Sequence, residues 1–249
     1  MKQDTGRLFI ENTKYRNMLP PPQQMGNAQP PFETEKAPGQ ELIKLPEPDS
    51  RFAKPIGLAE AINERRSIRE YSGHALTQEE LSYLLWCTQG VKTYIPGQAT
   101  FRTVPSAGAR HALDTYLLIN KVTGLSNGLY RYMAIEQGLV QISEEPGLAG
   151  RIVSDCLDQL MVKSCAVCFI WVAVVERMSW RYGERGFRYL FLDAGHVCQN
   201  LYLCAQAVGS GVCAIGAFSD DELNDTLNLD GINRFVIYLA CVGRIKGKE

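Results

Sequence analysis

The sequence contains little histidine and no excess of charge of either sign. Only 3 of its 249 residues are histidine, and 26 basic residues stand against 27 acidic ones, which leaves a net charge of −1. General binding to nucleic acid or to an anionic membrane surface needs a broad basic field, so this balance argues against both. Without a Cys/His spacing pattern, the sequence also predicts no dedicated metal site. Any anion-binding site is expected to be local.

Long hydrophobic runs and a signal peptide are missing too. The run at residues 165–175 is too short to cross a bilayer, and the run at residues 187–209 is interrupted by polar residues. These are Asp193, His196, Gln199 and Asn200, which would be costly in lipid. Residues 1–15 alternate in charge and lack an apolar core. We expect a soluble, cytoplasmic protein without a membrane partner.

Several catalytic motifs are absent. The sequence has no nucleophile elbow, no metalloprotease helix and no phosphate-loop lysine. Glycines at residues 209–216 follow a predicted helix and lead into a strand, which reverses the order of a dinucleotide-binding motif and excludes a Rossmann site. The eight cysteines lie mostly in apolar runs, so we interpret them as small buried hydrophobes.

Proline marks the predicted division of the chain. Residues 1–54 contain prolines at 20–22 and 30–31 among polar residues, so this Pro-rich segment is expected to run extended over the domain or over a partner subunit. Disorder is the alternative, although residues 8–10 and 42–45 provide apolar anchors. Residues 55–249 are predicted to form the folded domain.

Periodicity and capping signals place helices and strands in the second segment. Predicted helices cover residues 57–65, 77–89, 146–160, 187–208 and 219–227, with capping boxes that start at Thr77 and Ser219. Predicted strands cover residues 114–120, 128–132, 139–143, 166–175 and 235–242. Strands and helices do not alternate regularly, which favours an α+β fold with a central sheet packed around one or two long core helices.

The most informative motif is the arginine cluster, residues 65–69, in which three guanidinium groups flank a hydroxyl. Arg65, Arg66 and Arg69 can each bind phosphate oxygens in pairs, and Ser67 adds a further donor. This chemistry suits a phosphate monoester. A solvated helix C-terminus, where arginines meet the last carbonyl groups, is the alternative interpretation.

Three other segments are candidates for ligand contact. The small-residue loop at 104–109 lets a flat ligand approach its backbone, or it is an ordinary turn. The backbone at Gly216 can face a ligand in the same way. Residues 181–189 mix cations and aromatics, so they either bind an anionic or flat substrate or form a salt-bridged helix entry through Glu184. The pattern slightly favours the helix entry.

In their order along the chain, these motifs resemble the nitroreductase superfamily of flavin mononucleotide (FMN) enzymes, and in particular the branch of SagB-type dehydrogenases and azoline oxidases. The resemblance spans about residues 55–243 and rests on six motifs: residues 65–69, 105–109, 128–132, 181–186, 193–201 and 213–218. It implies a nitroreductase-like α+β fold, an intertwined homodimer with flavin at the interface, and FMN as cofactor. A flavin carries the hydride itself, so the missing catalytic motifs are not needed.

The resemblance also implies roles for particular residues. Arg65, Ser67 and Arg69 would hold the phosphate and ribityl chain, and Arg66 would contribute backbone or side-chain contacts. Arg244 and Lys246 are further candidate cations. Pro105, Ser106, Ala107 and Gly108 would line the ring, and Ile215, Gly216 and Ala217 would follow its edge, with the Gly216 amide facing N5. Arg110, Arg181 and Tyr182 would contact substrate. Azoline oxidases are thought to use a Lys-Tyr pair near the segment where this chain has Arg181 and Tyr182. Because arginine stays protonated and is a poor base, abstraction of a substrate proton would pass to Tyr182 or be lost.

The implied activity is hydride transfer through flavin N5 by a ping-pong mechanism. The substrate would be a small molecule or a modified peptide, and NAD(P)H is one candidate electron donor. Dehydrogenation of a heterocycle in a peptide and reduction of nitroaromatic or quinone-like acceptors both stay open. A non-catalytic flavin-binding accessory subunit of a peptide-modifying complex is the alternative, and a structural domain without flavin is the third hypothesis.

Overall fold

A central antiparallel sheet organises the molecule. The computed structural model describes residues 4–49, 51 and 53–247. Seven strands form one sheet in the order β1-β6-β5-β4-β7-β9-β8, and β2 and β3 form a separate hairpin. Each neighbouring pair is antiparallel. The expected α+β class is confirmed.

The elements have the following bounds. The strands are β1 Leu42–Lys44, β2 Val91–Ile95, β3 Ala99–Arg102, β4 Leu113–Ile119, β5 Gly128–Met133, β6 Gly138–Ser143, β7 Val167–Val174, β8 Ser210–Ile215 and β9 Arg234–Arg244. The α-helices are α1 Thr5–Asn12, α2 Leu58–Glu64, α3 Gln78–Gln89, α4 Leu148–Asp155, α5 Met161–Ser164, α6 Val175–Tyr182, α7 Gly186–Ala207 and α8 Asp220–Thr226. Among the described residues, no helix has both the length and the apolar composition needed to cross a membrane.

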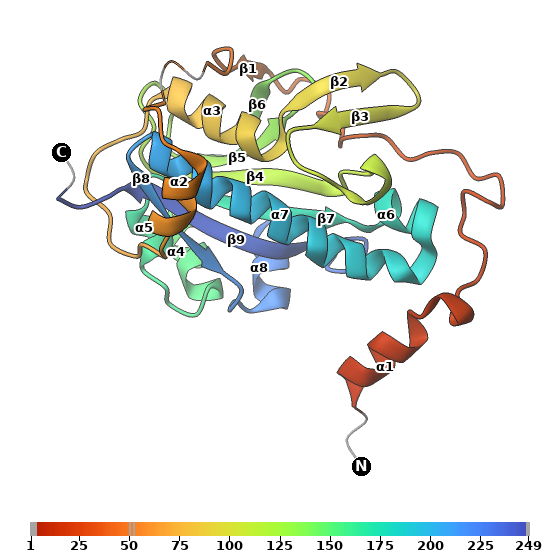
Figure 1. Ribbon diagram of the computed structural model, residues 1–249. Coiled ribbons are helices and arrows are strands. Elements are labelled where there is room, and N and C mark those ends of the chain that lie inside the picture. The colour runs from red at the N-terminus through yellow and green to blue at the C-terminus, as the bar shows by residue number, and fades with distance from the viewer. Residues whose placement is uncertain (1–3, 50, 52, 248–249) are drawn as a thin grey trace.

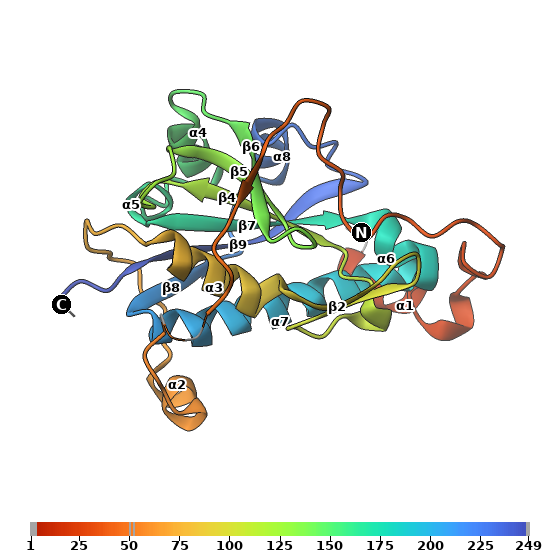
Figure 2. The ribbon, with the colours of Figure 1, turned by 90° about the horizontal axis from the view of Figure 1, so that it is seen from above.

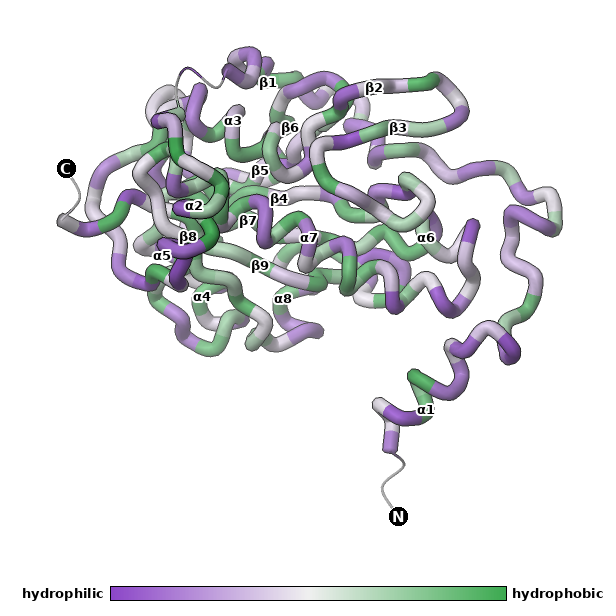
Figure 3. The backbone as a smooth tube through the Cα atoms, in the orientation of Figure 1, coloured by the Kyte–Doolittle hydropathy of each residue, from purple (hydrophilic) through white to green (hydrophobic). Residues whose placement is uncertain are grey.

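Helices cover both faces of the sheet (Figure 1). Figure 2 shows α3 and α7 on one face and α4, α5 and α8 on the other, while α2 stands away from these layers. β7 lies between β4 and β9 and is buried along its whole length, and Figure 3 shows it as a largely hydrophobic stretch. Its Phe169 and Trp171 join the core under α7, whereas Cys168 and Ile170 join the core on the opposite face. This alternation follows from the two-residue period of a strand.

The long central helix expected at residues 187–208 is α7, Gly186–Ala207. Leu190, Val197 and Leu201 recur at helical spacing and pack in the core. Phe191 and Leu192 point elsewhere and are each 57% exposed. The helix therefore has a buried face and an apolar face without a partner in the described chain.

Other expectations on the elements have mixed outcomes. The capping box at Thr77 is confirmed, because the Glu80 amide donates to the Thr77 hydroxyl and the Thr77 amide donates to the Glu80 carboxylate. The one at Ser219 is wrong, since its hydroxyl donates to the Glu222 carboxylate and caps no backbone amide. The helix predicted at 146–160 is too long. α4 ends at Asp155, and Leu157 and Asp158 adopt φ of 54° and 58°, which no right-handed helix contains.

The N-terminal segment crosses the surface of this body. Trp180 donates to the Asn27 carbonyl at 2.9 Å, Arg177 donates to the Pro31 carbonyl at 2.9 Å, and β1 pairs with β6 as an edge strand of the sheet. The division into residues 1–54 and 55–249 stays a prediction. Residues 1–3, 50, 52 and 248–249 of these two segments lie outside the described residues.

Candidate functional site

The arginine cluster follows α2 and lies against the edge of β8. The Ile68 amide donates to the Val212 carbonyl at 2.9 Å, and Ser67 forms a parallel bridge with Val212. Gly211 permits this approach, because a Cβ there would lie 2.6 Å from the Ile68 side chain. The chain after α2 is thus fixed to the sheet, with Arg65 and Ser67 at its edge.

Tyr202 of α7 connects the cluster to β8. Its hydroxyl lies 3.0 Å from Ser67 Oγ and accepts a hydrogen bond from the Ala214 amide at 2.9 Å. The Arg65 guanidinium carbon lies 5.4 Å from the centre of the Tyr202 ring, within the range of a cation–π contact. The sequence analysis did not identify Tyr202. The sequence pointed to Tyr202 only as an aromatic residue near the end of the predicted helix, shortly before the glycines at 209–216.

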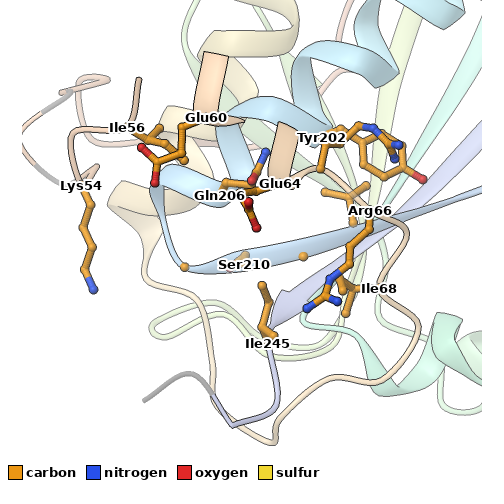
Figure 4. Close-up of a pocket in the computed structure, with 14 residues that line it drawn as sticks. Lys54, Ile56, Glu60, Glu64, Arg66, Ile68, Tyr202, Gln206, Ser210 and Ile245 are labelled. Carbon is orange, nitrogen blue, oxygen red and sulfur yellow. The ribbon is translucent and has the colours of Figure 1, made fainter. Parts of the chain in front are cut away.

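A cavity of about 250 Å³ lies between α2, the end of α7 and β8 (Figure 4). Arg65, Arg66 and the backbone of residues 209–212 line it, together with Lys54. In the described part of the chain, no carboxylate is within ion-pair distance of Arg65, Arg66 or Arg69. Glu60 and Glu64 of α2 also line the cavity. Arg65 and Arg66, two guanidinium groups without a carboxylate partner, are a donor set that fits a phosphate monoester, whereas Arg69 does not line the cavity.

The structure engages Arg244 elsewhere. Its Nη2 lies 2.5 and 2.6 Å from the two carboxylate oxygens of Glu80, and its Nη1 donates to the Val208 carbonyl. Lys246 Nζ lies 3.9 Å from a carboxylate oxygen of Glu70. In this arrangement Arg244 stabilises the junction of α3 and β9, and a phosphate would have to compete with Glu80 for it.

The predicted ring-lining loop, residues 105–108, is held by Asp193 of α7. Ser106 Oγ donates to Asp193 Oδ2 at 2.5 Å, and the Ala107 amide donates to Oδ1 at 3.3 Å. The His111 amide donates to Ser106 Oγ at 2.8 Å. Burial raises the pKa of Asp193, which is 4% exposed. The Ser106 hydroxyl therefore positions the loop, while Pro105 and Gly108 remain exposed.

The arginine cluster and this loop do not meet within one chain. Tyr202 and Asp193, which hold them, are nine residues apart on α7, a spacing of about 14 Å along a helix. The cavity beside the cluster and the cleft beside the loop share no lining residue. Within one chain, the two groups of residues that the sequence predicts to bind flavin are therefore apart.

Arg110, Arg181 and Tyr182 are brought together beside the loop. Gly108 has φ of 55°, and a Cβ on it would lie 2.5 Å from the Tyr182 hydroxyl and 2.9 Å from Arg181 Cδ. Arg110 Nε donates to the Gly108 carbonyl at 3.0 Å, and its guanidinium carbon lies 5.2 Å from the Trp180 ring centre. A cleft of about 900 Å³ opens here, lined by residues 108–111, Arg181 and the β2–β3 hairpin.

Residues 215–217 lie where β8 ends. Ile215 is 1% exposed and packs in the core under α4 and α8, so its side chain cannot line a ring. Gly216 and Ala217 are exposed. Gly216 follows the last register pair of β8 and β9, Ile215 with Leu239, so its amide lies outside the ladder.

The predicted salt bridges between Glu184 and the arginines at the start of the helix are wrong. No described cation forms an ion pair with Glu184. Arg185 instead donates to the Thr13 carbonyl at 2.7 Å and lies 4.1 Å from the Tyr15 ring centre, and Arg188 donates to Thr13 Oγ1 at 2.6 Å. These two arginines hold the N-terminal segment, which local spacing could not reveal.

A sequence model described as the nitroreductase family matches residues 62–244, about three quarters of the chain. The chain belongs to the nitroreductase family. Membership makes it an oxidoreductase. The nitroreductase-type protein MJ1384 of Methanocaldococcus jannaschii is 36% identical over 189 residues, which cover 76% of this chain and 91% of that protein. The trifolitoxin-processing protein TfxB of Rhizobium leguminosarum bv. trifolii is 28% identical over 154 residues, 60% of this chain and 41% of TfxB.

Solved structures share the fold. A nitroreductase-type protein of Anabaena variabilis superposes with a TM-score of 0.70 at 30% identity, over 84% of this chain and 42% of that one. The Escherichia coli microcin synthetase complex McbBCD, with truncated pro-MccB17 bound, matches at 0.60 and 18% identity, over 86% and 78% of the chains. A nitroreductase-type protein of Desulfovibrio desulfuricans in complex with FMN matches at 0.54 and 17% identity, over 78% and 88%. This chain spans less than half the length of the Anabaena protein and of TfxB.

Proposed function

We propose that this nitroreductase-family chain is an FMN-dependent oxidoreductase of the SagB-type dehydrogenase or nitroreductase kind. The observation that supports it most directly is the group of three guanidiniums without carboxylate partners at the edge of β8. FMN held here would supply hydride transfer through its N5 atom between a donor and an acceptor, in a ping-pong sequence. The neighbour that binds FMN supports this choice of cofactor.

The chain's own residues hold and orient this group. Arg65, Ser67 and Arg69 would bind the phosphate, and Tyr202 keeps Ser67 and Arg65 at the edge of β8. The exposed backbone at Gly216 offers an amide to the ring edge. Tyr182, whose hydroxyl lies beside Gly108, is the candidate group for moving a proton to or from substrate.

A homodimer would complete the site. The arginine cluster and the ring-lining loop lie about 14 Å apart along α7, so a twofold axis that crosses this helix brings the cluster of one copy next to residues 105–108 of the other. The unpartnered Phe191 and Leu192, each 57% exposed, lie on the same helix and fit a second copy of α7.

The substrate is a modified peptide or a small molecule, with NAD(P)H as a candidate donor. Similarity to a trifolitoxin-processing protein and to a microcin synthetase complex supports the peptide. Steady-state kinetics distinguish a reductase of small molecules from a dehydrogenase of modified peptides. Oxidation of NAD(P)H with a nitroarene indicates the reductase, and flavin reduction only by a peptide azoline indicates the dehydrogenase. Bound flavin without turnover by any donor indicates the accessory subunit.

The cofactor is tested by replacing two arginines of the cluster. R65A/R69A is expected to lose FMN, because each charge-assisted contact with a phosphate contributes about 1.5 to 3 kcal/mol. The measurement is the flavin absorbance at about 450 nm of the purified protein after incubation with FMN and desalting. The control R7A/K163A removes two charges from exposed sites on α1 and α5 and keeps its flavin. Equal flavin content in both variants contradicts the proposal.

A further inference from the structure

The cleft beside the ring-lining loop is lined by cations without an acid. Its lining residues include Lys92, Arg102, Arg110 and Arg181, and none of its described lining residues is aspartate or glutamate. Lys92, Arg110 and Arg181 form no ion pair with any described carboxylate. Since the whole chain has a net charge of −1, this concentration of positive charge is local.

Arg110 is the most informative of these cations. It is 6% exposed, and a buried guanidinium normally has an acidic partner. Its Nε donates to the Gly108 carbonyl, and its guanidinium lies on the Trp180 ring. Both Nη groups have no protein acceptor among the described residues, and they are not among the buried atoms without a partner, so they face the open cleft. Burial and the neighbouring Arg181 both lower the pKa of Arg110.

The surrounding backbone and side chains fix this arrangement. Gly108 at φ of 55° is followed by Ala109 and His111 at φ of 53° and 45°, which are unfavourable for residues with a side chain. Trp180, on which Arg110 lies, donates to the Asn27 carbonyl of the N-terminal segment. Arg102 also lines the cleft, is 7% exposed, and has an Nε without a hydrogen-bond partner in the described chain.

We infer that this cleft is an oxyanion subsite, which selects substrates that carry a carboxylate or a phosphate next to their reacting group. Arg110 and Arg181 bind the two oxygens of one face of the anion, and Lys92 on the hairpin adds charge at the rim. An anion supplies the counter-charge that the protein omits. The role of the cleft as a substrate site rests on the proposed function, whereas the binding of an anion there does not.

Calorimetric binding of matched ligands to the purified protein tests the subsite directly. The probes are benzoate, phenyl phosphate and the neutral isostere benzamide. We expect at least one anion to bind about 10-fold more tightly than benzamide, because one charge-assisted hydrogen-bonded pair contributes about this much affinity. R110Q and R181Q should each reduce this ratio to near unity; the exposed Arg181 provides a variant with no buried group to lose. K163Q, which removes a cation from α5 on the other face of the sheet, should keep it.

The outcomes separate the two proposals. A preference for benzoate identifies a carboxylate subsite, and a preference for phenyl phosphate identifies a phosphate subsite. A protein that binds flavin and turns over but binds all three probes equally, or whose ratio R110Q and R181Q leave intact, overturns the subsite alone. A protein that prefers the anion but takes up no FMN overturns the proposed cofactor and leaves the subsite standing.

Discussion

Single residues at this site act mainly by holding others in place. Tyr202 contacts Ser67, Arg65 and Ala214, Asp193 holds Ser106 and Ala107, and Trp180 supports Arg110. Each of these groups is aromatic or acidic and is at least partly buried. Their effects are therefore expected both in the free energy of unfolding and in binding.

Tyr202→Phe tests this directly. The variant keeps the ring and removes the hydroxyl, so the Ala214 amide loses its acceptor and Ser67 loses its partner. We expect the free energy of unfolding to fall by about 1 kcal/mol in urea titration and FMN to dissociate faster. Tyr94→Phe, on an exposed hairpin residue, should match the parent chain. Equal stability of Y202F and Y94F would contradict the role of the hydroxyl.

Gly108→Ala separates backbone strain from steric contact. Its positive φ costs about 1 kcal/mol for any residue with a Cβ, and the added methyl would also displace Tyr182 and Arg181. Gly39→Ala has a positive φ of 83° but open space around its Cβ, so it should show the backbone cost alone. Thermal unfolding should rank G108A below G39A, and only G108A should lose the benzoate preference. The same melting temperature for both would show that the contact with Tyr182 is not tight.

At the scale of elements, the N-terminal segment is attached to the sheet through a carboxyl pair. Glu33 accepts from the Ala134 amide at 2.8 Å and lies against the Glu136 carboxyl in the turn between β5 and β6. Burial, and then the neighbouring Glu136, raise the pKa of Glu33 from 4.5 to about 7. A proton held between the two carboxyls favours attachment of the segment.

This pair predicts a pH dependence of stability. The folded chain binds the proton more tightly than the unfolded chain, so the contribution is complete below about pH 4.5 and is lost as pH rises through about 7. Chemical denaturation should show a decrease of about 1 to 2 kcal/mol across that window. Glu33→Gln should flatten this slope, whereas Glu41→Gln, at an exposed position of the same segment, should not. An unchanged slope in E33Q would assign the effect to another group.

For the whole molecule, we propose that a second copy of the chain completes the flavin site. The arginine cluster and the ring-lining loop lie at different places along α7, and the same helix exposes Phe191 and Leu192. A twofold contact through α7 would cover this apolar surface and bring the two halves together.

Phe191→Glu is expected to break this contact, because it places a charge in an apolar interface. Light scattering should give the mass of a dimer for the parent chain and of a monomer for F191E, and the monomer should retain little FMN after desalting. Ile232→Glu changes an equally apolar residue, 73% exposed on a loop, and should remain dimeric. A monomeric parent chain that holds FMN would refute the shared site.

Features that depend only on neighbouring residues could be predicted from the sequence. The arginine cluster, the Thr77 capping box, the long central helix and the buried strand were all predictable, because each is encoded within a few turns or a few residues of chain. α6 was not predicted, because charged residues interrupt its short apolar pattern. The end of α4 was not predicted either, because it depends on a left-handed backbone that the residue types there do not predict.

Which groups meet at the site depends on how distant segments pack together, and the sequence did not reveal it. Ser67 and Tyr202 are separated by 135 residues, and Ser106 and Asp193 by 87, so no periodicity connects them. Arg244 has the right charge for a phosphate ligand, yet the fold places it against Glu80. Arg110 gains its significance from burial without an acid, a property of the surroundings rather than of the residue. Charge and helix propensity are local, whereas burial and pairing are set by the packing of distant segments.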